Sequence, residues 1–210
     1  MKGTTKGGNR PQPEEGSYGA RCIGIVDIGT QDIMYQGQAK SVRQVMLFFE
    51  LIGTKAVFDQ NKGEQPFVMH QKFTLSFNEK ANLRKFLKSW RNKDMTEQEA
   101  EDPLFMKNLL GKPLYLSVSI SEKDGKSYRN IGSIMKYPAN MPKLAAPENE
   151  TFYFDMDTEV PGNNPMEAFP KLYPWVQDMI VKSPEYHELF GNVQGSPENG
   201  NLAGDIDADF

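Results

Sequence analysis

Few residues in this chain of 210 have the types and spacing that catalysis requires. The two histidines, His70 and His187, lie far apart, and neither belongs to a His-x-x-x-His pair that could hold zinc. Neither has a motif around it from which a Ser-His-Asp or Cys-His nucleophile could be argued. No glycine-rich phosphate loop is present. One acidic cluster is best explained as the wet face of a helix: Glu97, Glu99, Glu101 and Asp102. The sequence therefore predicts that the protein is not an enzyme and needs no cofactor or metal.

The chemistry that remains is the binding of a nucleic-acid strand by aromatic and basic side chains. Sequence-tolerant binding of single strands needs a positive groove and aromatic faces, and each stacked base contributes roughly 1–3 kcal/mol. Each candidate taken alone is better explained as ordinary surface or core, but as a set they favour binding. They are spread over predicted strands and loops: Tyr35, Lys40, Arg43, Phe48, Lys72, Tyr115, Lys126, Tyr128 and Arg129.

Phe48 has two interpretations. Its predicted strand carries apolar side chains on both faces, with Met46 and Phe48 on the face where a half-exposed strand would be polar. Phe48 is then either covered by a second small cluster or a helix, or it is a base-stacking platform beside Arg43. The first interpretation is slightly favoured for Phe48 alone.

The last six residues suggest a second kind of binding. They are Asp-Ile-Asp-Ala-Asp-Phe, with carboxylates at alternate positions and an aromatic residue at the end. Such a segment suits a basic pocket with an apolar floor, because the ring fills the floor while the carboxylates meet Lys or Arg. We expect this tail to bind a partner through Asp205, Asp207, Asp209 and Phe210.

The central stretch alternates between strand and helix periods. Residues 67–76 have the period of a half-buried strand, and 83–90 place Leu83, Phe86, Leu87 and Trp90 at helical spacing. A second helical piece is expected over about 97–110. Residues 113–120 and 127–134 then read as strands joined by a hairpin turn at Asp124-Gly125.

The first part of the chain supplies two more strands, over 18–26 and 41–52, with a polar loop at 35–40. Between them, Asp27-Ile-Gly-Thr30 is a weak match to a phosphate loop and is interpreted as a turn. Two strands, a third strand, a helix and a final hairpin are the parts of an OB fold, a five-stranded Greek-key barrel. The sequence therefore predicts a mainly β protein, an OB barrel with a helical insert between its third and fourth strands.

The remaining segments are expected to be extensions of that barrel. Residues 1–16 lack apolar content, residues 191–210 have no Lys or Arg and four acids, and both segments are predicted to be disordered. Residues 137–147 are rich in proline and read as a linker. Residues 152–156 could add a strand, and 169–190 should form one or two short helices on the body or on a neighbouring chain. The predicted organisation is an arm over 1–16, the OB domain over 17–136, an extension over 137–190 and a tail over 191–210.

Composition points to a soluble chain. Only 38% of the residues are hydrophobic, 25% are charged, and no apolar run has the length of a membrane helix, roughly 18 residues. Residues 1–16 contain no apolar stretch typical of a signal peptide, and the single cysteine, Cys22, excludes an internal disulfide. We therefore expect the protein in the cytoplasm.

The net charge of −4 hides a strong asymmetry. Residues 1–136 carry 21 Lys and Arg against 15 Asp and Glu, a net +6, whereas residues 137–210 carry 3 against 13, a net −10. A basic body with an acidic end suggests a polyanion partner and a segment that competes with it. Tuning of solubility explains the charges equally well.

Two parts of the chain resemble a known family. The end, Asp205 to Phe210, resembles the acidic tail tip of bacterial and phage single-stranded DNA-binding proteins, although it lacks the proline that precedes Phe in the bacterial form. In the body, residues 73–76, 79–90, 109–112 and 128–134 resemble small phage-encoded single-stranded DNA-binding proteins. This resemblance implies an OB-type barrel without enzymatic activity, acting in DNA replication, recombination or repair in the host cytoplasm. It also implies that the tail recruits replication or recombination proteins and competes with DNA for the basic groove.

The predicted function is thus to coat and protect single-stranded DNA with little sequence preference. One alternative is an OB-fold interaction or assembly module that binds protein and no nucleic acid. Another is an RNA-binding OB protein. The sequence leaves open the preference between DNA and RNA, the site size and the formation of a homo-oligomer.

Overall fold

The computed structural model describes residues 11–123 and 125–191. Its strands are β1 (Gly16–Tyr35), β2 (Gln38–Asp59), β3 (Gly63–Thr74), β4 (Pro113–Lys123), β5 (Lys126–Lys136) and β6 (Phe152–Phe154). Between β3 and β4 lie α1 (Asn82–Arg91), α2 (Glu97–Glu101) and the 3-10 turn η1 (Lys107–Leu109). After β6 come α3 (Pro165–Ala168), η2 (Phe169–Lys171), α4 (Pro174–Ile180) and α5 (Pro184–Phe190). None of these helices is long and apolar enough to cross a bilayer.

The strands form one open sheet in a mainly β protein. The strand order is β3-β2-β1-β4-β5 with antiparallel neighbours, and the short β6 adds to β1 in parallel. Closure of the OB barrel predicted from the sequence would join β3 to β5. Within the described residues these two strands share no ladder, although Cα atoms of the two come within 8 Å of one another. The open edges of β3 and β5 therefore face each other.

The segment predicted to be a turn at Asp27–Thr30 lies inside β1 instead. The register with β2 shifts between Asp27 and Gly29, which is a β-bulge. Gly29 has φ +70°, which suits glycine, and its N–H donates to Asp27 Oδ1 at 3.0 Å. Because the bulge absorbs the extra residue, β1 and β2 continue together to a tight turn at Gln36-Gly37. The first strand is thus much longer than the sequence pattern predicted.

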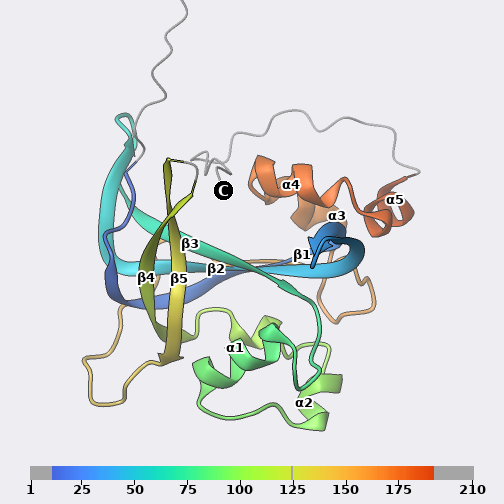
Figure 1. The fold of residues 1–210 in the computed structure, drawn as a ribbon, viewed down its shortest axis with the longest axis horizontal. Coiled ribbons are helices and arrows are strands. Elements are labelled where there is room, and N and C mark those ends of the chain that lie inside the picture. Colours follow the sequence, from blue (N-terminus) through green and yellow to red (C-terminus); the bar gives the residue numbers. More distant parts are fainter. Residues whose placement is uncertain (1–10, 124, 192–210) are drawn as a thin grey trace, which may run out of the picture.

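The sheet is covered on both faces, which creates two hydrophobic cores. On one side, Leu47 and Phe49 of β2 pack with Leu87 and Trp90 of α1. On the other side, a second core joins β1 and β2 to β6, α4 and the segment around η2. Figure 1 shows α1 and α2 on one side of the sheet and α3, α4 and α5 on the other. The predicted strand over 152–156 and the helices over 169–190 are present, and they complete the second core.

This second core explains the apolar side chains on both faces of β2. Phe48 is 0% exposed, and its ring centroid lies 5.1 Å from Phe152, 5.9 Å from Tyr173 and 6.0 Å from Trp175. The extension after residue 137 supplies all three of these rings. The expectation that Phe48 presents its face to a base is therefore not met in this structure, and the alternative of a covering cluster holds.

Phe152 lies directly against the backbone of β1, at Gly24. A Cβ atom at position 24 would lie 2.1 Å from Cζ of the Phe152 ring. We expect Gly24→Ala to lower the free energy of unfolding by about 1–3 kcal/mol or more, because the ring must leave its place in the core. Urea denaturation measures this loss. Gly16→Ala in the same strand is the matched control, since its nearest contact would be an ordinary 3.5 Å; equal losses for both variants would contradict the packing argument.

Candidate nucleic-acid interface

A groove runs between the open edges of β3 and β5. We call it the lysine groove, after Lys40, Lys72, Lys80 and Lys85 in its lining. It has a volume of about 950 Å³ and is bordered by residues 131–134 of β5, by α1 and by the β1–β2 hairpin. None of the described residues that line it is acidic. The groove is therefore a concentration of positive charge in a chain whose net charge is −4.

Each lysine reaches the groove from a different element. Lys40 is exposed near the start of β2, and Lys72 lies on the edge strand β3. Lys80 precedes α1 in a turn where its N–H donates to Asn78 Oδ1 at 3.1 Å. Lys85 is in the first half of α1, on the side away from the buried Leu83 and Leu87. The burial of α1 against the sheet thus presents its outer face to the groove.

The other cations of α1 and the loop that follows it are each paired with a carboxylate. Arg84 Nε and Lys88 Nζ contact Asp94 at 2.9 and 3.1 Å. Arg91 and Lys93 both pair with Glu99. These bonds hold the pKa values of both carboxyl groups well below their usual range.

Three of the groove lysines differ from these paired cations. Within the described part of the chain, Lys40, Lys80 and Lys85 form no ion pair. Burial lowers the pKa of Lys72, so its charged form gains from an incoming anion. Three lysines that form no ion pair within the described residues therefore line the groove.

Aromatic and hydrogen-bonding groups accompany the lysines. Tyr35, at the end of β1, is 58% exposed and lines the groove. The floor contains Phe86 and Phe73, whose ring centroids lie 4.7 Å apart. Gln44 and Ser133 add polar groups from opposite sides. The groove can therefore contact phosphates, bases and sugar edges together.

Three of the nine predicted nucleic-acid residues line this groove: Tyr35, Lys40 and Lys72. Lys126 is exposed at the start of β5, outside the lining. The two other predicted residues of the last hairpin, Tyr128 and Arg129, are half-buried. Arg129 Nε donates to the Pro13 carbonyl at 3.3 Å. The three predicted residues of this hairpin, Lys126, Tyr128 and Arg129, therefore do not line the groove.

Tyr115 also lies away from the groove. It is half-buried on β4 with its ring centroid 6.4 Å from Tyr137. Phe48 is in the second core, as described above. Of the aromatic residues predicted to stack on bases, only Tyr35 lines the groove, and the half-buried Phe86 lines it as well.

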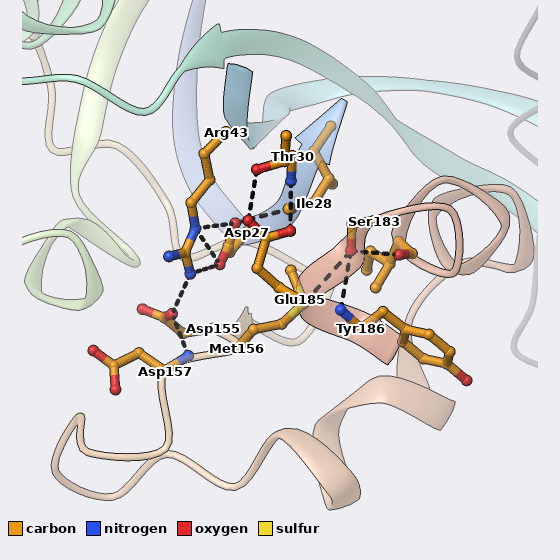
Figure 2. A network of polar contacts seen from close by, with 12 residues as sticks. Asp27, Ile28, Thr30, Arg43, Asp155, Met156, Asp157, Ser183, Glu185 and Tyr186 are labelled. Atoms are coloured by element: carbon orange, nitrogen blue, oxygen red, sulfur yellow. Dashed lines mark hydrogen bonds and ion pairs between the residues drawn. The ribbon is translucent and has the colours of Figure 1, made fainter. Parts of the chain in front are cut away.

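Arg43 belongs to an internal network that joins the sheet to the C-terminal extension. Figure 2 shows its guanidinium directed at Asp27, which is 4% exposed, with Asp155 4.0 Å away. The Asp27 partner raises the pKa of Arg43, and burial raises the pKa of Asp155. Beside them, Glu185 accepts bonds from the N–H and Oγ1 of Thr30 at 2.9 and 2.6 Å. The positive charge of Arg43 is thus paired with carboxylates of the fold itself.

Lys80 and Lys85 line the groove but are not among the nine nucleic-acid residues predicted from the sequence. The pattern that distinguishes them is the position of the acids: Asp94 and Glu99 follow α1 and pair with cations at 84, 88, 91 and 93. The predicted tail residues, Asp205, Asp207, Asp209 and Phe210, lie outside the described residues. Residues 1–10 of the predicted arm lie outside them as well.

Comparisons with known proteins add no assignment. No protein-family model matches the chain, and no curated protein matches it significantly. In the described ranges, no group of three or more His, Cys, Asp or Glu side chains could hold a metal ion.

Proposed function

We propose that the protein binds single-stranded DNA in the lysine groove, with little sequence preference. The observation that carries this proposal is the collection of four lysines in a groove with no acidic residue among its described lining. A polyanion is the ligand that such a groove favours. The exposed Tyr35 ring offers a face on which a base can stack.

The sheet supports an OB-type interpretation of this groove. An OB fold is a partly open five-stranded barrel whose strand 2–3 face and first hairpin loop bind oligonucleotides. In this chain, the corresponding positions are Lys72 on β3 and Tyr35 and Lys40 beside the first hairpin turn. We infer an OB barrel left open between β3 and β5, with the binding groove at the opening.

The wider role is proposed from the resemblance to phage single-stranded DNA-binding proteins. On this proposal the protein protects single strands during DNA replication, recombination or repair in the cytoplasm of the host. Its acidic tail would recruit other proteins of those processes.

The test is the binding of a fluorescent oligo-dT of about 15 nucleotides, measured by anisotropy over a range of salt. If four phosphates are contacted, the logarithm of the binding constant should fall by about 3 per tenfold rise in salt, at about 0.7 per contact. We expect Lys80→Gln/Lys85→Gln to reduce this slope by about 1.4 and to weaken binding at every salt concentration.

The matched control is Lys88→Gln/Lys93→Gln, which removes the same charge from the same helical region. Both of its lysines already pair with Asp94 or Glu99. The control should leave the slope nearly unchanged. Equal losses for the two double variants would show a non-specific charge effect, and no binding by the wild-type chain would overturn the proposed function. A preference for duplex DNA or for RNA in the same assay would replace single-stranded DNA as the ligand.

A further inference from the structure

A second positively charged hollow lies where β4 begins and β5 ends. We call it the cationic hollow. It has a volume of about 600 Å³ and is lined by Arg21, Lys112, Lys143, Tyr137 and Met141, among others. None of the described residues in its lining is acidic. Apart from the lysine groove, the other described pockets that contain a cation also contain a carboxylate.

The walls of the hollow are fastened by Arg21. Its guanidinium donates to the carbonyls of Gly111, Leu144 and Ala145 at 2.6, 2.6 and 2.5 Å. This ties the segment before β4 and the segment after β5 to the same side chain of β1. Gly19 allows the close approach, because a Cβ there would lie 2.7 Å from Leu144 Cδ1. The hollow is therefore formed in advance, with no ligand needed to hold its walls.

The two lysines of the hollow are held near each other but are not neutralised. The loop that carries Lys112 is bonded to β1 through Gly111 N–H to the Cys22 carbonyl, 2.8 Å, and Cys22 N–H to the Lys112 carbonyl, 3.2 Å. Lys112 and Lys143 are exposed and form no ion pair within the described residues. Arg21 adds a third positive charge, because its hydrogen bonds go to neutral carbonyl groups and not to a carboxylate. An anion entering the hollow would therefore find two lysine donors ready.

The hollow adjoins the lysine groove at two points. Ser89 lines the groove, and its neighbour Trp90 donates its Nε1–H to the Pro113 carbonyl, in the lining of the hollow, at 2.9 Å. Along β5, Ile134 lines the groove and Tyr137 lines the hollow. Three residues of extended chain span at most about 11 Å. Lining residues of the groove and of the hollow thus lie within about 11 Å of each other along the chain at the end of β5.

We propose that the cationic hollow binds phosphate groups of the strand that occupies the lysine groove. This inference rests on the proposed function, because it extends the path of the same ligand. The hollow then acts as a second contact point, at which Lys112 and Lys143 meet the backbone after it leaves the bases at the groove. Phosphate is favoured over a carboxylate peptide because the hollow adjoins the groove.

The test uses the full-length chain, with Lys112→Gln/Lys143→Gln compared with Lys171→Gln/Lys182→Gln as matched control. The control lysines lie in the C-terminal extension, outside the lining of both the groove and the hollow. For an oligo-dT of about 15 nucleotides, the hollow variant should lower the salt slope by about 1.4, while the control leaves it unchanged. In parallel, inorganic phosphate should cause saturable NMR shifts of the Gly111 and Tyr137 amides in the wild type and not in the hollow variant.

The outcomes separate the two proposals. If Lys80→Gln/Lys85→Gln weakens binding and the hollow variant matches the control, the inference is overturned and the proposed function stands. If the wild type does not bind oligo-dT, the proposed function falls and the phosphate titration alone decides: saturable shifts support a phosphate site, and their absence overturns it. A hollow variant that keeps its oligo-dT affinity but loses binding of hexaglutamate overturns the phosphate assignment in favour of a carboxylate site.

Discussion

The Phe48→Ala substitution is expected to lower the free energy of unfolding by about 3–5 kcal/mol. Phe48 is among the largest fully buried side chains, and its ring contacts Phe152, Tyr173 and Trp175 in the second core. Truncation at Cβ removes these contacts and leaves a cavity, because the two long strands beneath the ring cannot collapse into the space. Equilibrium unfolding in urea, followed by tryptophan fluorescence, measures the loss directly, since Trp175 packs on the same ring.

Binding measurements on Phe48 variants separate the core role from a base-stacking role. Phe48→Leu keeps most of the apolar volume but removes the aromatic face, so it should retain oligo-dT affinity and lose much less stability than Phe48→Ala. The oligo-dT affinity of Phe48→Leu is compared with that of Tyr35→Ala under native conditions, because Tyr35 is exposed at the groove. If Phe48→Leu weakened oligo-dT binding at least as much as Tyr35→Ala while stability changed little, the buried position of Phe48 would be contradicted.

The strands could be predicted from the sequence because their side-chain period is local. The alternation over 67–76 and 113–120 corresponds to β3 and β4, and β4 pairs with β5 in antiparallel register up to Lys123 and Lys126, as expected for a hairpin. The lengths of β1 and β2 could not be predicted in this way. A bulge at Asp27–Gly29 looks like a turn in sequence, and only pairing with β2 shows that the strand continues.

Closure of the sheet is a tertiary property that no local pattern reports. Periodicity fixes which face of β3 or β5 is apolar, but it does not say whether their edges pair. In this structure the edges stay apart, and the space between them becomes the groove. The arrangement of β3 and β5 in the predicted OB barrel was therefore the part of the fold class with the least support in the residues themselves.

The site was only partly predictable for a related reason. Charge and aromatic character identify candidates, but their use depends on partners that are distant in sequence. Arg43 pairs with Asp27, sixteen residues away, whereas Lys85 is left without an ion pair because Asp94 pairs with Arg84 and Lys88. Phe48 is removed from the candidates by rings that lie more than 100 residues further along the chain. The sequence pattern could therefore indicate the residue types, whereas only three of the nine predicted nucleic-acid residues line the groove.

Stability is expected to fall in mild acid because of His70. Its ring packs beside Phe48 and Trp175, with centroid distances of 5.6 and 5.0 Å, and burial, with Lys72 nearby, lowers its pKa to about 4. The ordinary value is 6.5, so between about pH 6.5 and pH 4 the unfolded chain binds a proton at His70 that the folded chain does not. The free energy of unfolding must therefore decrease as the pH falls through this window. The loss from His70 amounts to about 2 kcal/mol between pH 7 and pH 4.5, and to about 3 kcal/mol in full.

The difference between wild type and His70→Gln isolates this effect. Other groups also titrate: the raised pKa of Asp155 contributes with the opposite sign, and the lowered pKa values of Asp94 and Glu99 contribute with the same sign in stronger acid. These contributions are common to both proteins and cancel in the comparison. Urea unfolding at a series of pH values should give a flatter profile for His70→Gln between pH 7 and pH 4.5, whereas His187→Gln, at an exposed position of α5, should follow the wild type. Parallel profiles for wild type and His70→Gln would mean that His70 takes up its proton equally well in the folded protein. The ring would then have to be open to solvent, and the packing of α4 over β3 would be looser than the contacts of Trp175 indicate.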